Sequence, residues 1–191
     1  MPSQLTVSIG QYSDKGRKAV NQDFQGVLVP KEPLLSTKGI AIGIADGISS
    51  SNVSHIASET SIRSLIEDYY CTSETWSVKK SADQVLTASN SWLYSQSQKG
   101  EHRFDKNKGY VCTLSAMIIK STTAHVFHLG DSRIYRFRNQ DLEQLTEDHR
   151  GWISSEQSYL SRAMGIHSKL ELDYASFAVE ANDIFLCLIN V

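Results

Sequence analysis

Three aspartates in this sequence stand where a carboxylate could bind a metal ion. Asp23, Asp46 and Asp131 each lie at the end of an apolar run, and Gly47 and Gly130 are next to two of them. A strand would fix each carboxylate in place, and a neighbouring glycine lets an ion or substrate approach the backbone. Ligands that are all oxygen suit hard cations such as Mg²⁺ and Mn²⁺. Asp-Gly is also a common turn dipeptide, so each motif taken alone is better explained as a turn.

The segments next to these aspartates are short, mostly apolar runs, which makes them strand candidates. Residues 24–29 follow Asp23, residues 39–45 precede Asp46, and residues 124–129 end beside Gly130. Three short runs with turn residues between them follow one another from residue 112 to residue 138, and there we expect a β-meander. The complete set of expected strands is 5–10, 24–29, 39–45, 112–120, 124–129, 133–138, 170–179 and 184–188.

Two longer segments have the 3.6-residue apolar spacing of helices. We expect one helix over residues 53–70 and a second over residues 77–98, with Gly100 as its stop. A short helix is expected over residues 157–164, and residues 99–110 are expected to form an exposed loop. Strands, then two adjacent helices, then strands again indicate an α+β fold, a mostly antiparallel β-sandwich flanked by α-helices.

The composition is that of an ordinary globular protein, with 40% hydrophobic and 21% charged residues, and residues 1–191 fit a single domain. The net charge is −2 and the basic residues are scattered, which argues against nucleic acid as a partner. No leader pattern opens the chain and no run approaches the ~20 apolar residues of a membrane span, so a cytoplasmic location is expected. Cys71, Cys112 and Cys187 lack the spacing of a zinc or disulfide site and are expected to be buried thiols.

The order of the motifs resembles that of the metal-dependent serine/threonine protein phosphatases, the type 2C phosphatases, and in particular their bacterial members. Five motifs follow one another in the order of that family and span nearly the whole chain. They are GRKAVNQD at 16–23, IADG at 44–47, GDSRIY at 130–135, QLTEDH at 144–149 and SRAMG at 161–165.

The resemblance implies direct hydrolysis of phosphoserine and phosphothreonine in proteins by water bound to two Mn²⁺ or Mg²⁺ ions. Asp46 would bridge the ions, the carbonyl of Gly47 would bind one of them, and Asp23 would contact the metal directly or through water. A cation in the first motif would grip the phosphate. Lys18 stands at the usual place, and Arg17, one residue away, would bind in a bidentate manner.

The sequence also departs from the family pattern. Gln22 replaces an acidic residue of many members, and Ile48 stands where relatives often have His or Met. No Asp-Gly follows the last apolar run, residues 184–188, so we expect a domain that is incomplete at the C-terminus. At least two carboxylate ligands would then be missing, and the chain would hold one ion or none.

Two functions therefore remain open. The first is a protein serine/threonine phosphatase. The second is a non-catalytic or truncated phosphatase-like domain that binds a phosphoprotein or a kinase, or associates with itself through an exposed C-terminal sheet edge. The resemblance to phosphatases encoded beside or fused to bacterial kinases suggests a serine/threonine kinase as a partner. The turn around Asp131 is expected to be a scaffold, in which Asp131 bonds backbone amides and Arg133 forms a buried ion pair.

Overall fold

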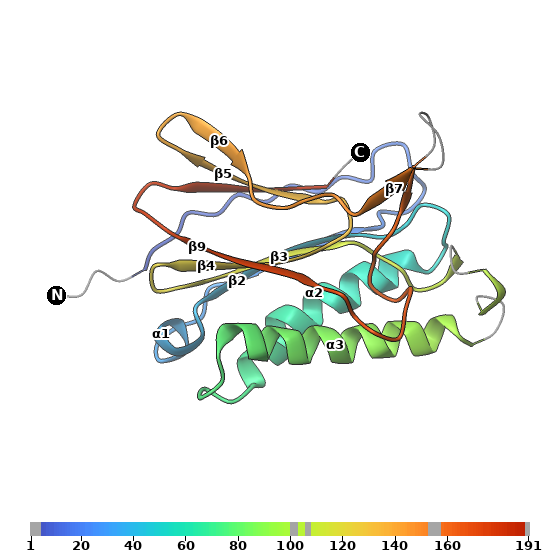
Figure 1. The fold of residues 1–191 in the computed structure, drawn as a ribbon, viewed down its shortest axis with the longest axis horizontal. Helices are drawn as coiled ribbons and strands as arrows, with labels where there is room; N and C mark the ends of the chain where they lie inside the picture. Colours follow the sequence, from blue (N-terminus) through green and yellow to red (C-terminus); the bar gives the residue numbers. More distant parts are fainter. Residues whose placement is uncertain (1–4, 100–102, 106–107, 153–157, 190–191) are drawn as a thin grey trace.

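A five-stranded antiparallel sheet forms the centre of the molecule, and two helices cover one of its faces (Figure 1). The computed structural model describes residues 5–99, 103–105, 108–152 and 158–189. The strand order is β1-β2-β3-β4-β9, and each strand pairs antiparallel with its neighbour. The strands are β1 Asp23–Leu28, β2 Ile40–Asp46, β3 Leu114–Lys120, β4 Thr123–Leu129 and β9 Asp173–Ala178.

The two long helices that the 3.6-residue spacing predicts are confirmed. α2 spans Ser54–Cys71 and α3 spans Val78–Ser97, and they pack side by side on the sheet (Figure 1). The Ser77 side chain accepts a hydrogen bond from the backbone N–H of Lys80 and so caps the N-terminus of α3. The expected stop at Gly100 lies outside the described residues. A short helix, α1 Leu34–Lys38, was not expected.

Two glycines allow α2 to lie close to the sheet. Gly26 of β1 and Gly43 of β2 are cross-strand partners. A Cβ atom at Gly26 would lie 2.7 Å from the side chain of Ile62, and a Cβ atom at Gly43 would lie 2.9 Å from it. The fully buried Ile62 therefore packs directly on the sheet backbone, at the centre of the core between helices and sheet.

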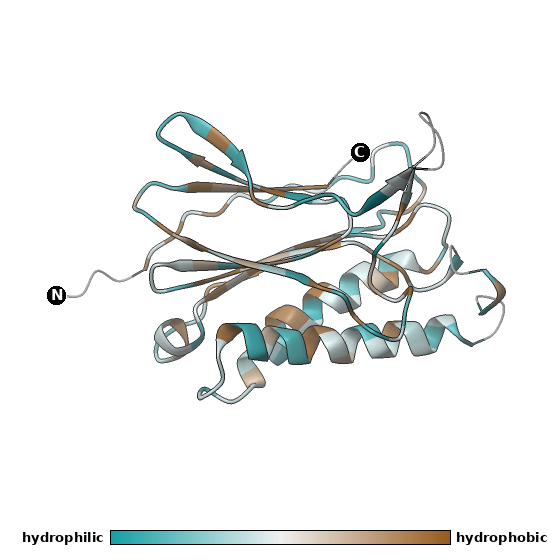
Figure 2. Cartoon of the chain, viewed as in Figure 1, coloured by the Kyte–Doolittle hydropathy of each residue, from teal (hydrophilic) through white to brown (hydrophobic). Residues whose placement is uncertain are grey.

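A second, three-stranded sheet covers the other face of the first. Its order is β10-β5-β6, with β5 Arg133–Arg138, β6 Asp141–Gln144 and β10 Ile184–Leu188. Met117, Ile119 and Val126 of the first sheet pack with Ile134 of the second in a separate core cluster. Figure 2 shows hydrophobic segments in the strands of both sheets. The arrangement confirms an α+β sandwich with antiparallel sheets.

The C-terminal half corrects two expectations. The β-meander is wrong, because the chain leaves the first sheet after β4 and enters the second at β5. The helix over residues 157–164 is also wrong in its described part. β8 Ser158–Leu160 pairs there with β7 Arg150–Trp152, and Met164 forms a bridge with Cys112. A short apolar run has too few turns to reveal its period, and the tertiary partner decided its conformation.

Two further expectations fail at the surface. Residues 5–10 alternate in polarity but form no strand, and Val7 and Ile9 are exposed. Alternation stabilises a strand only when another strand supplies hydrogen bonds, and none of the described strands pairs with this segment. The expectation of three buried thiols is also wrong in part. Of the three thiols, only Cys112 is buried, whereas Cys71 is exposed and Cys187 is half-buried.

Among the helices of the described residues, none combines the length and the apolar character that crossing a membrane requires.

Candidate metal centre

Two aspartates meet where β1 begins and β2 ends. Asp23 is the first residue of β1 and Asp46 the last residue of β2, and the antiparallel register places them directly opposite each other. Directly opposite residues have Cβ atoms about 5 Å apart. Because each side chain belongs to a strand of the central sheet, the backbone fixes the separation of the two Cβ atoms.

The electrostatics of this pair are unfavourable without a cation. Burial raises the pKa of Asp46, and the hydrogen bond with Asp23 and the charge of Asp23 raise it further. One carboxylate oxygen of each residue, Oδ1 of Asp23 and Oδ1 of Asp46, is buried without a hydrogen-bond partner among the described residues. Buried carboxylate oxygens are normally paired or bound to a metal. The pair therefore fits a divalent cation, although the described residues contain no group of three or more His, Cys, Asp or Glu arranged to hold one.

Gly47 must be glycine for packing reasons. A Cβ atom there would lie 2.7 Å from the backbone of Ser54 at the start of α2. The Gly47 N–H donates to the carbonyl of Gln22, at 3.0 Å, which ties the segment after β2 to the segment before β1. The backbone at Gly47 is thus held close to α2. That the Gly47 carbonyl binds a metal ion stays a prediction.

The side chain of Gln22 has several hydrogen-bond partners in the segment that follows Gly47. Its side-chain Nε2 faces the carbonyls of Ile48 and Ser51, at 3.2 and 2.8 Å, and Oγ of Ser54, at 2.8 Å. The Ser54 hydroxyl in turn donates to the carbonyl of Ile48. A glutamate at position 22 could not donate these hydrogen bonds, so the amide organises the loop that follows Gly47.

The two candidate phosphate-binding cations lie on the exposed segment before β1. The charge of Lys18 acts on Asp46 and lowers its pKa, in opposition to burial and to Asp23. We therefore expect Lys18, the cation with the largest opposing effect on this pKa, to be the phosphate-binding residue, and both cations stay candidates.

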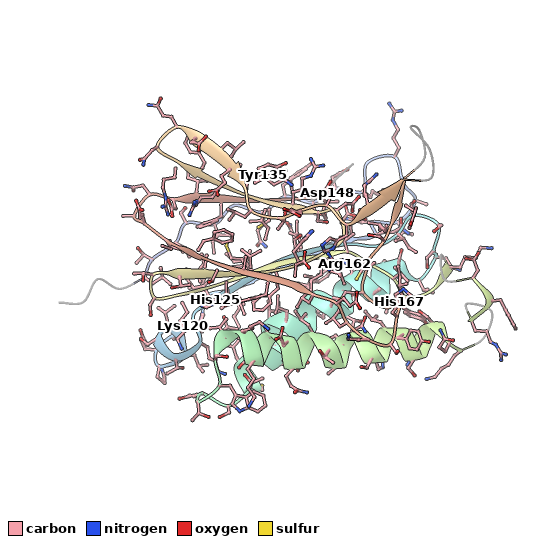
Figure 3. All side chains as sticks on the ribbon, in the orientation of Figure 1. Lys120, His125, Tyr135, Asp148, Arg162 and His167 are labelled. Atoms are coloured by element: carbon pink, nitrogen blue, oxygen red, sulfur yellow. The ribbon has the colours of Figure 1, made fainter. Side chains whose placement is uncertain are left out.

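The turn between β4 and β5 holds two ion pairs. Arg133 donates to both carboxylate oxygens of Asp148, at 2.8 and 2.6 Å, so the expected ion pair is present, but it is not buried, because the Arg133 side chain is 37% exposed. Asp148, labelled in Figure 3, comes from the segment between β6 and β7. The expectation that Asp131 bonds backbone amides is wrong for the described residues, because its carboxylate accepts hydrogen bonds from Nε and Nη2 of Arg150, the first residue of β7. Sequence reasoning missed Arg150, because no sequence spacing links it to Asp131.

A buried histidine network was also missed. His149 accepts a hydrogen bond at Nδ1 from the Gly130 N–H, at 3.1 Å, and its Nε2 lies 2.8 Å from Oδ2 of Asp173. Arg162, labelled in Figure 3, donates to Asp173 at 2.7 Å. These hydrogen bonds join the motifs around Gly130, His149 and Arg162 to one another and to β9. The three motifs therefore support the fold of this region.

We expect the stability of the fold to fall as the pH drops from about 6.5 to 4, because of His128. This side chain is 2% exposed, and burial, followed by the charge of His149, lowers its pKa to about 4. The unfolded chain takes up the proton near pH 6.5 and the folded chain only near pH 4, so the folded state is penalised between these values, by roughly 3 kcal/mol in total.

Urea unfolding at pH 7 and pH 5 measures this loss. His128→Gln should show a smaller difference between the two pH values, whereas His167→Gln, which changes an exposed histidine, should behave like the unsubstituted chain. A pH dependence that His128→Gln leaves unchanged would assign the effect to another group.

Comparison with known proteins gives the same family by two routes. Residues 11–187 match the family model of protein phosphatase 2C. The chain is 30% identical over 200 residues to the serine/threonine phosphatase stp of Listeria welshimeri, an alignment that covers 91% of this chain and 73% of that protein.

Solved structures share the fold. PppA, described as a key regulatory component of T6SS in Pseudomonas aeruginosa, superposes with a TM-score of 0.71 at 21% identity, covering 92% of this chain and 74% of that one. The catalytic domain of the serine/threonine phosphatase PstP, solved with two manganese ions, gives a TM-score of 0.67 at 22% identity, covering 89% and 71%.

Proposed function

This chain belongs to the protein phosphatase 2C family, and we propose that it hydrolyses phosphoserine and phosphothreonine in proteins at the Asp23–Asp46 centre. The family makes it a protein serine/threonine phosphatase. One observation carries the placement of the site: two opposed aspartates on neighbouring strands each keep a buried carboxylate oxygen without a partner among the described residues. That arrangement is costly unless a cation binds there.

The residues of this chain have separate roles in the proposal. Asp46 and Asp23, with the carbonyl of Gly47, hold Mn²⁺ or Mg²⁺. A divalent ion bound there would supply an acidified water molecule and offset negative charge on the phosphoryl oxygens. Gln22 holds the loop after Gly47, and Lys18 or Arg17 binds the phosphate of the substrate.

The number of ions in the proposal follows from the ligands. The family arrangement implied by the resemblance has two ions, whereas the described residues contain no group of three or more His, Cys, Asp or Glu that could hold one. We therefore propose one weakly bound ion, with any second ion held more weakly still, because each carboxylate adds both a ligand and a compensating charge.

Turnover of a phosphothreonine peptide across a Mn²⁺ titration tests the function. We expect slow hydrolysis that needs added metal, rises with Mn²⁺ and disappears with a chelator. Turnover that is indifferent to metal would contradict the proposal. An absence of turnover at every Mn²⁺ concentration would favour the alternative, a phosphatase-like binding module.

The alternative has an observation of its own. Ile184, Leu186 and Leu188 alternate along β10, are 51%, 41% and 51% exposed, and lie on the edge strand of the second sheet. An exposed apolar edge favours association with another chain. Self-association through this edge, a serine/threonine kinase as a partner and a cytoplasmic location stay proposals.

A further inference from the structure

A third carboxylate, that of Asp131, lies near the Asp23–Asp46 centre but forms an ion pair with the guanidinium of Arg150. The side chain of Asp131 is 8% exposed, and its Oδ2 accepts hydrogen bonds from two nitrogens of the Arg150 guanidinium. Asp131 belongs to the turn that links the two sheets, and Arg150 opens the β7–β8 hairpin. An arginine with two hydrogen bonds to a carboxylate restricts where that carboxylate can point.

The turn that carries Asp131 packs against the support of Asp46. Thr113 donates its backbone N–H to the Asp46 carbonyl, at 2.8 Å, and its Oγ1 accepts from the Asp46 N–H, at 3.0 Å. The same Oγ1 lies 2.8 Å from Oγ of Ser132. A Cβ atom at Gly130 would lie 2.6 Å from the Thr113 side chain, so the turn contacts Thr113 directly.

The charge of Asp131 reaches the centre over this short path. It is one of the charges that raise the pKa of Asp46, as Asp23 is. Even so, no described group of three acidic, histidine or cysteine side chains is close enough to hold a metal together. The third carboxylate therefore stands beside the pair without joining it, and its described hydrogen bonds go to Arg150.

We infer that Arg150 is a positioning residue that lowers the divalent-cation affinity of the Asp23–Asp46 centre by holding and neutralising Asp131. The inference rests on the proposed metal centre. A divalent ion at the centre is repelled by the Arg150 cation and attracted by the Asp131 anion, and these effects nearly cancel while the pair is intact. Loss of the guanidinium leaves a net negative charge at the site and frees the carboxylate to turn towards the ion.

Four variants of the chain separate these contributions, with calorimetric titration of Mn²⁺ as the measurement. Arg150→Gln should bind Mn²⁺ roughly tenfold more tightly, and Asp131→Asn roughly tenfold more weakly, because it leaves Arg150 uncompensated beside the centre. The double variant should return near the affinity of the unsubstituted chain. Arg150→Lys, which keeps the charge, should also stay near it.

A matched control removes the other guanidinium of the same turn. Arg133→Gln breaks the ion pair with Asp148 and leaves the Asp131–Arg150 pair intact, so its Mn²⁺ affinity should be unchanged. Circular dichroism and thermal melting show that each variant is folded. An increase in affinity confined to Arg150→Gln, reversed in the double variant, supports the inference.

The titrations distinguish failure of the inference about Arg150 from failure of the proposed metal centre. If Mn²⁺ binds to the unsubstituted chain, is lost in Asp46→Asn, and is unchanged in Arg150→Gln, this inference is wrong and the metal centre stands. Equal changes in Arg150→Gln and Arg133→Gln would also overturn it, because they would reflect a general effect of the turn. Absence of Asp46-dependent binding in the unsubstituted chain would overturn the inference and the metal centre together.

Discussion

The Asp46→Asn variant is expected to lose Mn²⁺-dependent phosphatase activity by roughly 100-fold or more, and to melt at a higher temperature than the unsubstituted chain when metal is absent. The loss follows because Asp46 supplies one of the two carboxylates of the proposed centre. The gain in stability follows from the same burial, which raises the pKa of Asp46 and makes the ionised pair with Asp23 unfavourable in the folded state. Asparagine has nearly the same shape, so packing is kept.

Two measurements check this pair of effects. Peptide turnover across a Mn²⁺ titration gives the activity, and thermal melting in chelator gives the stability, with an expected rise of a few degrees, about 1 kcal/mol. Asp68→Asn, the same chemical change on the exposed face of α2, is the matched control and should alter neither. Undiminished Mn²⁺-dependent turnover in Asp46→Asn would exclude the centre. A lower melting temperature would mean that Asp46 supports the fold instead.

The Lys18→Ala variant is expected to lower kcat/KM for a phosphopeptide roughly 10- to 100-fold without weakening Mn²⁺ binding. Lys18 lies on an exposed segment, and its charge already acts on Asp46. A phosphate at the centre would therefore gain a charge-assisted contact with it, whereas a metal ion would be repelled by it. Removing this cation should reduce substrate use and leave metal affinity equal or slightly higher.

The parallel Arg17→Ala variant decides between the two cations. Lys18 has the largest effect among the charges that lower the pKa of Asp46, so we expect Arg17→Ala to have a smaller effect on kcat/KM than Lys18→Ala. A larger effect would identify Arg17 as the phosphate-binding residue. Equal losses of substrate use and metal affinity in either variant would show that the residue supports the structure of this segment.

The parts of the fold that could be predicted are those in which the period of the sequence matches one buried face. α2 and α3 turn residues at helical spacing to the core, and β10 is a short apolar run. The segment 5–10 alternates apolar and polar residues but has no strand partner among the described residues, and pattern alone does not reveal that. β8 is too short for its period to be read.

The candidate site was partly predictable for a different reason. Asp23 and Asp46 could be selected by residue type and by their place at strand ends, but their contact depends on the register of β1 with β2. Arg150 and Asp173 carry no local signal at all. Each meets its partner, Asp131 or His149, only because the sheets bring distant segments together.

The pairing of the strands also sets an order of assembly. β1 with β2 and β3 with β4 are hairpins between neighbours in the chain, whereas β4 with β9 and β5 with β10 join segments far apart in sequence. Closing a longer loop costs more entropy, so the hairpins can form first and the edges contributed by β9 and β10 last. On the ribosome, the β1–β2 hairpin emerges well before those strands. We therefore expect the two aspartates to come together early, ahead of the second sheet that covers the other face.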